Sequence, residues 1–513
     1  MSIIKTIFTV ATITLLSRLL SLISLQTYMA YFGPFDVYIN IYSFALTIPL
    51  VIFNIIGTII VAVVVPIYSG LIAKDKNMAS NFINNITTIV CVIVCILVFF
   101  SYFGVVLLAD ITGFHYQYRN FLIYALRVTI FSMFFYGLHY IFQGILHSHN
   151  KFILASFVTV PTSLIIICYV FIFGNTFGVR GLIYATVFGL SLQAIILLPA
   201  VIKQGFRYIP TINLKNEHVR KAMCLSAPVL LSVISFQINT FFNASLATRF
   251  NIVTIMAYVQ NLAIVLVLSF VYSVTNVYLP KLTQIWESSG KVSNFKTTLE
   301  DVILICLFFL IPVAFGFLLL RFEIINLLAA WGNFNIYGVT IAANMLGIYG
   351  FGVLSIGIKE VIDRAFYAQK NSKVPGFVGF LIMVINVVFS LFTINVFEIY
   401  TMAISFALSN SVGVVFLLLF NKKSIGSFSS RLSKNAIKFI ISAVIMSICV
   451  YFVRNFFSGI YLQTQFFTRV LQLFVPTIVG VIVYIICIIF LKVQGVDVVN
   501  LALKNKVRKY IKY

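Results

Sequence analysis

The chain has 513 residues, of which 61% are hydrophobic and only 9% are charged. A water-soluble domain has roughly a quarter of its residues charged, so this composition excludes one and indicates a polytopic membrane protein. The formal net charge is +23, yet the cations are spread over many loops instead of forming one basic region. We therefore do not expect nucleic-acid binding.

Long apolar runs predict about fourteen transmembrane helices, since a helix needs about 20 apolar residues to cross a bilayer. The absence of strand-like alternation with short turns favours a helical bundle over a barrel. In the first half the predicted helices cover 3–30, 38–71, 80–109, 119–147, 152–174, 178–202 and 222–248. In the second half they cover 252–280, 299–321, 338–363, 374–395, 399–421, 435–455 and 471–491. Because Arg18 interrupts the first run, we interpret that run as a retained helix and not as a signal peptide.

The distribution of Lys and Arg predicts that both termini are cytoplasmic. With fourteen helices and both ends inside, most cations fall in inner segments, as the positive-inside rule requires. The outer segments hold only arginines, namely Arg119, Arg180, Arg249, Arg321, Arg454 and Arg469.

Weak internal similarity predicts two repeats. The stretch VVVPIYSGLIAKDKN (63–77) resembles VYLPKLTQIWESSGK (277–291), and similar loops surround Asn150 and Asn371. Repeats of equal orientation are related by an axis along the membrane normal and enclose a cavity, although apolar sequence can also resemble itself by chance. We predict an N-terminal lobe (1–210), a C-terminal lobe (211–425), two additional helices (426–492) and a basic cytoplasmic tail (493–513). The tail could rest on anionic lipid or be solvated.

Two arginines, Arg18 and Arg127, lie inside predicted helices. A charge at such depth costs about 3 kcal/mol and usually faces a cavity or a partner. No carboxylate lies near Arg18 in the sequence, so an anionic ligand is a reasonable counter-charge, and a guanidinium can bind phosphate through two parallel hydrogen bonds. The alternative is an arginine that binds backbone carbonyls or extends to the membrane surface.

The tenth predicted helix carries a second charged group near its inner end. It consists of Lys359, Glu360, Asp363 and Arg364. We expect local ion pairs of Lys359 with Glu360 and of Asp363 with Arg364, or a role in gating.

Amides add a further set of polar groups within the helices. They bridge helices by hydrogen bonds in many membrane proteins, and they can also line a cavity. The set consists of Asn40, Asn54, Gln237, Asn239, Asn243, Gln260 and Asn261.

Several motifs, in this order and spacing, resemble the MurJ (MviN) family of lipid II flippases, within the multidrug/oligosaccharide-lipid/polysaccharide exporter superfamily. They are SRLLSL, IPLVIFNIIG, LRVTIF, SAPVLLSVISFQINTFFN and FYAQKNSKVP. The resemblance implies two lobes around a cationic cavity that receives the diphosphate and sugars of lipid II. Arg18 and Arg127 match family arginines, and Gln237 and Asn243 match the spacing of the seventh helix.

The chain departs from the family pattern at other positions. Ser24, Phe53 and Asn261 stand at or beside family arginines, and Asn40 stands at a family aspartate. The resemblance therefore implies either a lipid II flippase with fewer cations or a flippase for an O-antigen, capsule or other polysaccharide repeat unit.

On this interpretation the substrate-binding residues are Arg18, Arg127, Asn40, Gln237, Asn243 and Asn261. We expect a monomer in the bacterial cytoplasmic membrane, with a lipid-linked saccharide and membrane lipids as partners and without a cofactor or metal.

Two other classes of function remain as alternatives. A cation-coupled multidrug antiporter would need carboxylates at membrane depth, and the first six predicted helices offer none. An enzyme would need clustered acid, base or metal-binding groups, whereas Asp110, His115, Glu323 and Glu398 are scattered singly. The seven cysteines show no metal-site spacing. A metal site at His139, His147 and His149, near the inner end of the fourth helix, is an unfavoured alternative.

Overall fold

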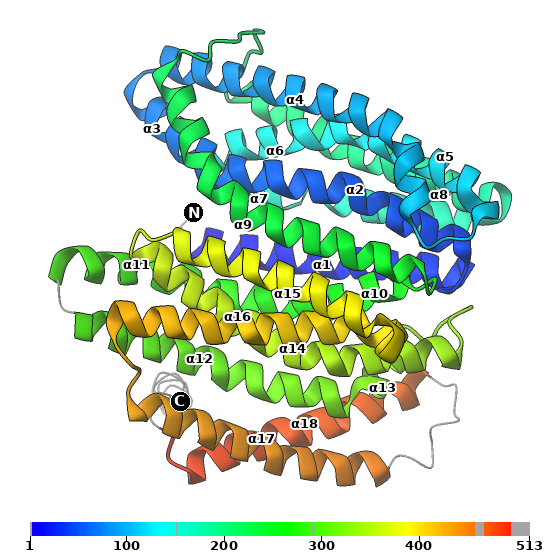
Figure 1. Ribbon diagram of the computed structural model, residues 1–513, viewed down its shortest axis with the longest axis vertical. Helices are drawn as coiled ribbons and strands as arrows, with labels where there is room; N and C mark the ends of the chain where they lie inside the picture. The colour runs from blue at the N-terminus through cyan, green and yellow to red at the C-terminus, as the bar shows by residue number, and fades with distance from the viewer. Residues whose placement is uncertain (1–2, 150, 158, 290–291, 457–465, 494–513) are drawn as a thin grey trace, which may run out of the picture. The chain divides into compact units, whose positions relative to one another are not determined.

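The computed structural model describes residues 3–149, 151–157, 159–289, 292–456 and 466–493, and within these ranges every regular element is helical (Figure 1). The predicted all-α polytopic class is therefore confirmed. The first half contains α1 (Ile3–Phe32), α2 (Val37–Ile59), α3 (Val65–Lys74), α4 (Lys76–Ile111), α5 (Arg119–Ile130), α6 (Ser132–Ser148), α7 (Phe152–Ser156), α8 (Thr159–Lys203) and α9 (Glu217–Thr248). The second half contains α10 (Val253–Gln260), α11 (Leu266–Ser289), α12 (Val292–Leu319), α13 (Arg321–Leu328), α14 (Ile336–Ala368), α15 (Lys373–Phe397), α16 (Thr401–Ile425), α17 (Ser430–Phe456) and α18 (Phe466–Phe490).

The described residues contain 11 apolar spans long enough to cross a membrane. Two of these, of 52 and 53 residues, are too long for one crossing. The first bends back at Gly178, whose φ of 54° suits a residue without a Cβ. The second is interrupted by the short 3₁₀ segment Glu398–Tyr400 between α15 and α16. With each long span read as two crossings, and with the more polar α9 added, the count is close to the predicted fourteen.

The chain divides into two compact units. The first comprises the residues up to 258 together with 331–338 and 390–402, and the second comprises the remainder. Helix α9 packs along α2 in the first unit. Residues 331–338 belong to the same unit, where the backbone N–H of Asn333 donates to the Ala30 carbonyl at 2.7 Å. The predicted lobe boundaries stay a prediction, and the basic tail lies outside the described residues from 494 onward.

Each unit contains a π-helical segment at a comparable place in the chain. Ile60–Val64 joins α2 to α3, and Asn261–Val265 joins α10 to α11. In both cases the segment interrupts the second helix of a predicted lobe, 38–71 in the N-terminal lobe and 252–280 in the C-terminal lobe. Single π-turns of this kind loosen the regular hydrogen-bond ladder and frequently mark functional sites.

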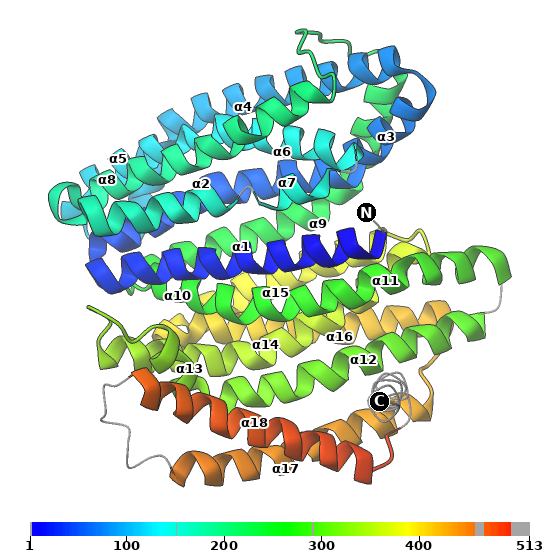
Figure 2. The ribbon, with the colours of Figure 1, turned by 180° about the vertical axis from the view of Figure 1, so that it is seen from behind.

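The two C-terminal helices α17 and α18 lie side by side in both views and pack on α12 and α13 within the second unit (Figures 1 and 2). Polar contacts between distant segments hold them there. Arg454 of α17 pairs with the buried Glu323 of α13 at 2.5 Å, and Arg431 pairs with Asp301 at 2.9 Å. Arg469 of α18 donates to the Ala330 carbonyl at 2.6 Å, and Tyr484 donates to the Phe308 carbonyl at 3.1 Å.

Candidate functional site

Arg18 lies on an exposed side of α1. The helix packs against α7 and α8 through a row of serines: Ser17 donates to the Ser156 carbonyl at 3.2 Å, and Ser21 bonds Ser163 at 3.3 Å. Arg18 is turned about 100° away from Ser17, since successive helical residues differ by that angle. Within the described part of the chain Arg18 has neither a hydrogen-bond partner nor a carboxylate. It is therefore available to an anion.

Ser24 and Phe53, which stand at or beside family arginines, have other roles here. Ser24 is buried on the serine-lined side of α1 and donates to the Ser21 carbonyl at 2.8 Å. Phe53 of α2 is fully buried and stacks on Tyr136 of α6, with ring centroids 5.0 Å apart. The resemblance implies cations at or beside these two positions, and the structure has packing groups there.

Arg127 has an intramolecular partner. Its guanidinium lies over the ring of Tyr102 on α4, 4.9 Å from the centroid. This is a cation–π geometry, which stabilises a charge where water is scarce. The structure does not bring Arg127 into a hydrogen-bonded group with the other predicted site residues that it describes.

Asn40 is completely buried and uses both ends of its amide. Its Nδ2 donates to the carbonyls of Pro34 and Asp36, each at 2.9 Å, and its Oδ1 accepts from the Thr254 N–H at 3.0 Å. These bonds join the start of α2 to the start of α10. A substrate contact would have to displace one of them, so the geometry favours a structural role.

The amides of α9 are buried but less fully bonded. Gln237, Asn239 and Asn243 are all nearly inaccessible to solvent. The Oδ1 atoms of Asn239 and Asn243 accept no hydrogen bond from the described residues. Because a buried carbonyl oxygen without a donor is costly, these amides are suited to a polar group or water that the chain itself does not supply.

Asn261 is exposed and opens the π-helical segment Asn261–Val265 of the second unit. Sequence reasoning singled out this residue because of its alignment with a family arginine, and had no means of predicting the local backbone.

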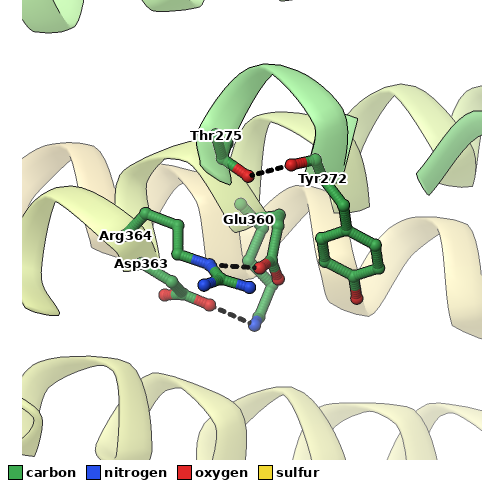
Figure 3. A network of polar contacts seen from close by, with 6 residues as sticks. Tyr272, Thr275, Glu360, Asp363 and Arg364 are labelled. Atoms are coloured by element: carbon green, nitrogen blue, oxygen red, sulfur yellow. Dashed lines mark hydrogen bonds and ion pairs between the residues drawn. The ribbon is translucent and has the colours of Figure 1, made fainter. Parts of the chain in front are cut away.

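The charged group on α14 forms two ion pairs (Figure 3). Lys359 pairs with Asp363 at 2.6 Å, and Arg364 pairs with Glu360 at 2.8 Å. The expected pairing of adjacent residues is wrong, because side chains at i and i+1 point in different directions whereas those at i and i+4 lie one above the other.

The α14 ion pairs also contact a neighbouring helix. Figure 3 shows Arg364 and Glu360 beside Tyr272 of α11, and the Arg364 guanidinium lies 5.8 Å from the centroid of that ring. Asp363 is buried, and its Oδ1 has no donor in the described structure. The arrangement links α14 to α11 within the second unit by charge.

The histidines of α6 have aromatic neighbours. The buried His139 lies edge-on to Tyr140 at 5.1 Å, and His149, just beyond the helix, lies edge-on to Tyr68 at 6.1 Å. Burial, with a contribution from Lys151, lowers the pKa of His149. No group of three His, Cys, Asp or Glu side chains suited to a metal ion occurs among the described residues.

Sequence reasoning missed the role of the acidic residues that hold α17 and α18. Glu323 appears in the sequence as an isolated acid at the outer end of a helix, yet it is buried against Arg454, 131 residues away. The sequence feature that could have predicted this pair is a single glutamate within a mostly apolar stretch, because a buried carboxylate needs a cation from elsewhere in the chain.

Comparison with known proteins decides the family. Residues 29–472 match the family described as lipid II flippase MurJ. The chain belongs to the MurJ family. Membership places it among the flippases that move lipid II across a membrane, and so among transporters.

Individual MurJ relatives are distant in sequence. The chain is 22% identical to a probable lipid II flippase MurJ of Rickettsia prowazekii over 405 residues, which cover 76% of this chain and 78% of the relative. Similar proteins of Borreliella burgdorferi and Treponema pallidum are 25% and 28% identical, and the matches span about half of each chain, 54% and 55%.

Solved structures confirm the fold. A lipid II flippase MurJ in an inward closed conformation superposes with a TM-score of 0.79, at 22% identity, and covers 94% of this chain and 98% of that one. An inward-facing multidrug transporter of the MATE family and the MOP superfamily gives a TM-score of 0.67 at 17% identity, and covers 83% of this chain and 99% of that one. These likenesses show that the chain shares the fold of these two transporters.

Proposed function

We propose that this protein flips lipid II across the bacterial cytoplasmic membrane by alternating access, with both termini cytoplasmic, and that Arg18 contacts the diphosphate. The observation that supports this role is the state of Arg18: an exposed guanidinium on an apolar helix, without a carboxylate partner in the described structure. A cation held in this way is stabilised when an anionic group binds it. The protein is proposed to act as a monomer.

The proposed contact between Arg18 and the diphosphate contributes a small free energy of binding. A charge-assisted hydrogen bond contributes about 1.5–3 kcal/mol. With Ser24 and Phe53 in place of cations, fewer such bonds are available than the family pattern implies. We expect the diphosphate to be held by Arg18 together with amide groups. Gln237 and Asn243 are the best candidates because both are buried, and the Oδ1 of Asn243 accepts no hydrogen bond from the described residues.

Alternating access requires helices that can bend. The π-helical segments Ile60–Val64 and Asn261–Val265 are suited to this, one in each unit. The α14 ion pairs are proposed to hold α14 against α11 in one state of the cycle, as charge pairs between moving elements can do.

A second candidate substrate is another polyprenyl-diphosphate saccharide, such as an O-antigen or capsule repeat unit. The observation that favours it is the stacked pair of Phe53 and Tyr136, at or beside a position where the resemblance implies an arginine. A different headgroup would tolerate the loss of that cation.

The drug antiporter alternative has less support. The aspartates of the first unit are at helix ends and engaged: Asp36 and Asp75 cap α2 and α4, and Asp110 pairs with Arg119 at 2.7 Å.

Transport by purified protein in vesicles tests the proposal. Labelled lipid II is flipped by the wild type, and Arg18→Ala is expected to reduce the rate at least about tenfold, which corresponds to about 1.4 kcal/mol. Leu19→Ala, a change at the next exposed position of α1, is the matched control and should retain the wild-type rate. Wild-type flipping by a correctly inserted Arg18→Ala protein would remove the proposed role of Arg18.

The substrate is tested in parallel. The same vesicles are loaded with a polyprenyl-diphosphate O-antigen unit, and a conditional strain without its own lipid II flippase is complemented with the gene. Flipping of the O-antigen unit without flipping of lipid II, and a failure to complement, would favour the second candidate.

A further inference from the structure

The linker between α8 and α9, residues 204–216, exposes large apolar side chains next to cations. Ile209 is 59% exposed and Ile212 is 62% exposed, and Tyr208 and Leu214 are also exposed. A linker in water normally turns such side chains inward. Their exposure over a short stretch indicates a surface that is covered by something apolar.

The linker has a fixed path along α4. Asn85 of α4 makes two hydrogen bonds with the backbone of Asn213. Its Nδ2 donates to the Asn213 carbonyl at 3.0 Å, and its Oδ1 accepts from the Asn213 N–H at 3.1 Å. Thr88 accepts from the Thr211 N–H at 3.2 Å and bonds the Tyr208 hydroxyl at 3.2 Å. These hydrogen bonds fix the backbone of the linker on α4, so the outward direction of its apolar side chains is set by the structure.

Phe206 fixes the start of the linker, because its ring is buried in the core of the first unit against Phe142. Both ribbon views show the linker beside the α3 end of α4 (Figures 1 and 2).

The position along α4 gives the depth of the linker in the membrane. Apart from Met78 in the first turn, the exposed large apolar side chains of α4 begin at Val92 and continue through Ile96 and Phe99, as expected of a face in contact with lipid chains. Thr88, which holds the linker, precedes Val92 by one helical turn, or about 6 Å along the axis. The headgroup layer on each side of a bilayer is about 5–8 Å thick. The linker therefore lies at the level of the lipid headgroups.

The charge around the linker is strongly positive. The exposed cations of this stretch are Lys203, Arg207, Lys215, Arg220 and Lys221, and Glu217 is the acid among them. None of these cationic side chains has an ion-pair partner in the described part of the chain. Anionic lipid attracts such cations, each strengthening binding by about fivefold near the surface.

We propose that residues 203–221 form a docking surface for anionic phospholipid headgroups of the adjoining leaflet, with Ile209, Ile212 and Leu214 inserted between the lipids. The pairing of unpartnered cations with exposed apolar side chains at headgroup depth fits an anionic bilayer surface. A protein partner could bind such side chains at any distance from the bilayer, so the position of the linker at the headgroup level favours lipid. The surface fixes the orientation of the first unit in the membrane, and it is separate from the proposed substrate contact at Arg18.

Fluorescence quenching by lipid tests this proposal. In full-length protein with Trp286→Phe and Trp331→Phe, the variant Ile212→Trp is reconstituted into vesicles that contain brominated phosphatidylglycerol or brominated phosphatidylcholine. We expect quenching by both lipids, and at least about twofold stronger quenching by phosphatidylglycerol because it concentrates at the cations. Leu214→Trp provides a second reporter position if Ile212→Trp does not fold.

The charge dependence completes the test. Adding Lys203→Gln, Arg207→Gln and Lys215→Gln should abolish the preference for phosphatidylglycerol, whereas Lys422→Gln and Lys423→Gln at the exposed end of α16 should retain it. No quenching by either lipid would show that the linker faces water or a protein, and equal quenching by both lipids would show that no headgroup is selected. Either result would overturn the proposal.

Discussion

Hydrogen-bond saturation separates the candidate residues into two kinds. Asn40 has its donors and its acceptor occupied by backbone groups of its own unit, whereas Arg18 has none of its donors occupied by described residues. Both stand out in the sequence as polar residues in apolar runs. Removing the first should affect stability, and removing the second should affect transport.

Asn40→Ala is expected to destabilise the protein. It leaves the Thr254 N–H and the Pro34 carbonyl without partners in a buried place, which costs about 1–3 kcal/mol for each such group. Thermal unfolding in detergent should therefore begin at a lower temperature, while the flipping rate per folded molecule stays near the wild-type value. A large loss of rate with an unchanged melting curve would instead assign Asn40 to the substrate site.

The stabilisation of the Arg127 charge is expected to depend on the ring of Tyr102. Replacing the ring by an aliphatic group in Tyr102→Leu should lower the free energy of unfolding by about 1 kcal/mol, whereas Tyr102→Phe keeps a π face and should be close to neutral. Chemical denaturation of the two variants provides the measurement. Equal effects would show that the contact at 4.9 Å contributes no cation–π stabilisation.

At the scale of the element, α14 offers a test of the Lys359–Asp363 pair. Lys359→Met leaves the buried carboxylate of Asp363 unpaired, and we expect a loss of about 3 kcal/mol in stability. The double variant Lys359→Met/Asp363→Leu replaces the pair by apolar groups and should recover most of that loss. Melting temperatures of the wild type, both single variants and the double variant give the coupling energy.

Transport by the double variant then distinguishes gating from simple support of the fold. A protein that melts like the wild type but flips slowly would assign the pair to the transport cycle. Normal melting together with normal flipping would restrict the pair to a structural role.

The elements show where sequence reasoning succeeds and where it ends. Apolar run length is sufficient to predict α4, α12 and α17, because a membrane helix is defined by hydrophobic length. The break between the helices predicted for 152–174 and 178–202 falls where the structure turns at Gly178. The π-helical segments have no compositional signature, since they result from packing around one extra residue.

Candidate residues show the same limit. The sequence identifies Arg18 because a charge in an apolar run is rare, but it cannot distinguish a free guanidinium from one covered by a ring, as at Arg127. Partners far apart in the sequence, such as Glu323 and Arg454, become visible only when the helices are packed.

At the scale of the whole molecule, the attachment of α17 and α18 to the rest of the second unit depends on polar contacts between distant segments. Glu300 accepts hydrogen bonds from the backbone N–H and the hydroxyl of Ser429, at 2.7 Å and 2.6 Å, just before α17 begins. Glu323 pairs with Arg454 near the other end of the same helix. The helix is therefore fixed at both ends, and its apolar side chains need only fill the space between.

Removing the Glu323 charge should loosen this attachment without unfolding the protein. Glu323 is 1% exposed, so Glu323→Gln leaves the Arg454 guanidinium partly buried without its counter-charge, and we expect a loss of about 3 kcal/mol that is confined to α13, α17 and α18. Hydrogen exchange followed by mass spectrometry should show faster exchange in residues 430–456 and 466–490, with residues 37–111 unchanged.

The matched control is Lys370→Ala, which removes the ion pair between Lys370 and Glu287. The Lys370 side chain is 73% exposed, and such surface pairs contribute at most about 1 kcal/mol. The exchange pattern of Lys370→Ala should therefore match that of the wild type. Uniformly faster exchange throughout the chain in Glu323→Gln would mean that the two C-terminal helices are part of one cooperative unit with the rest, and not a separately anchored pair.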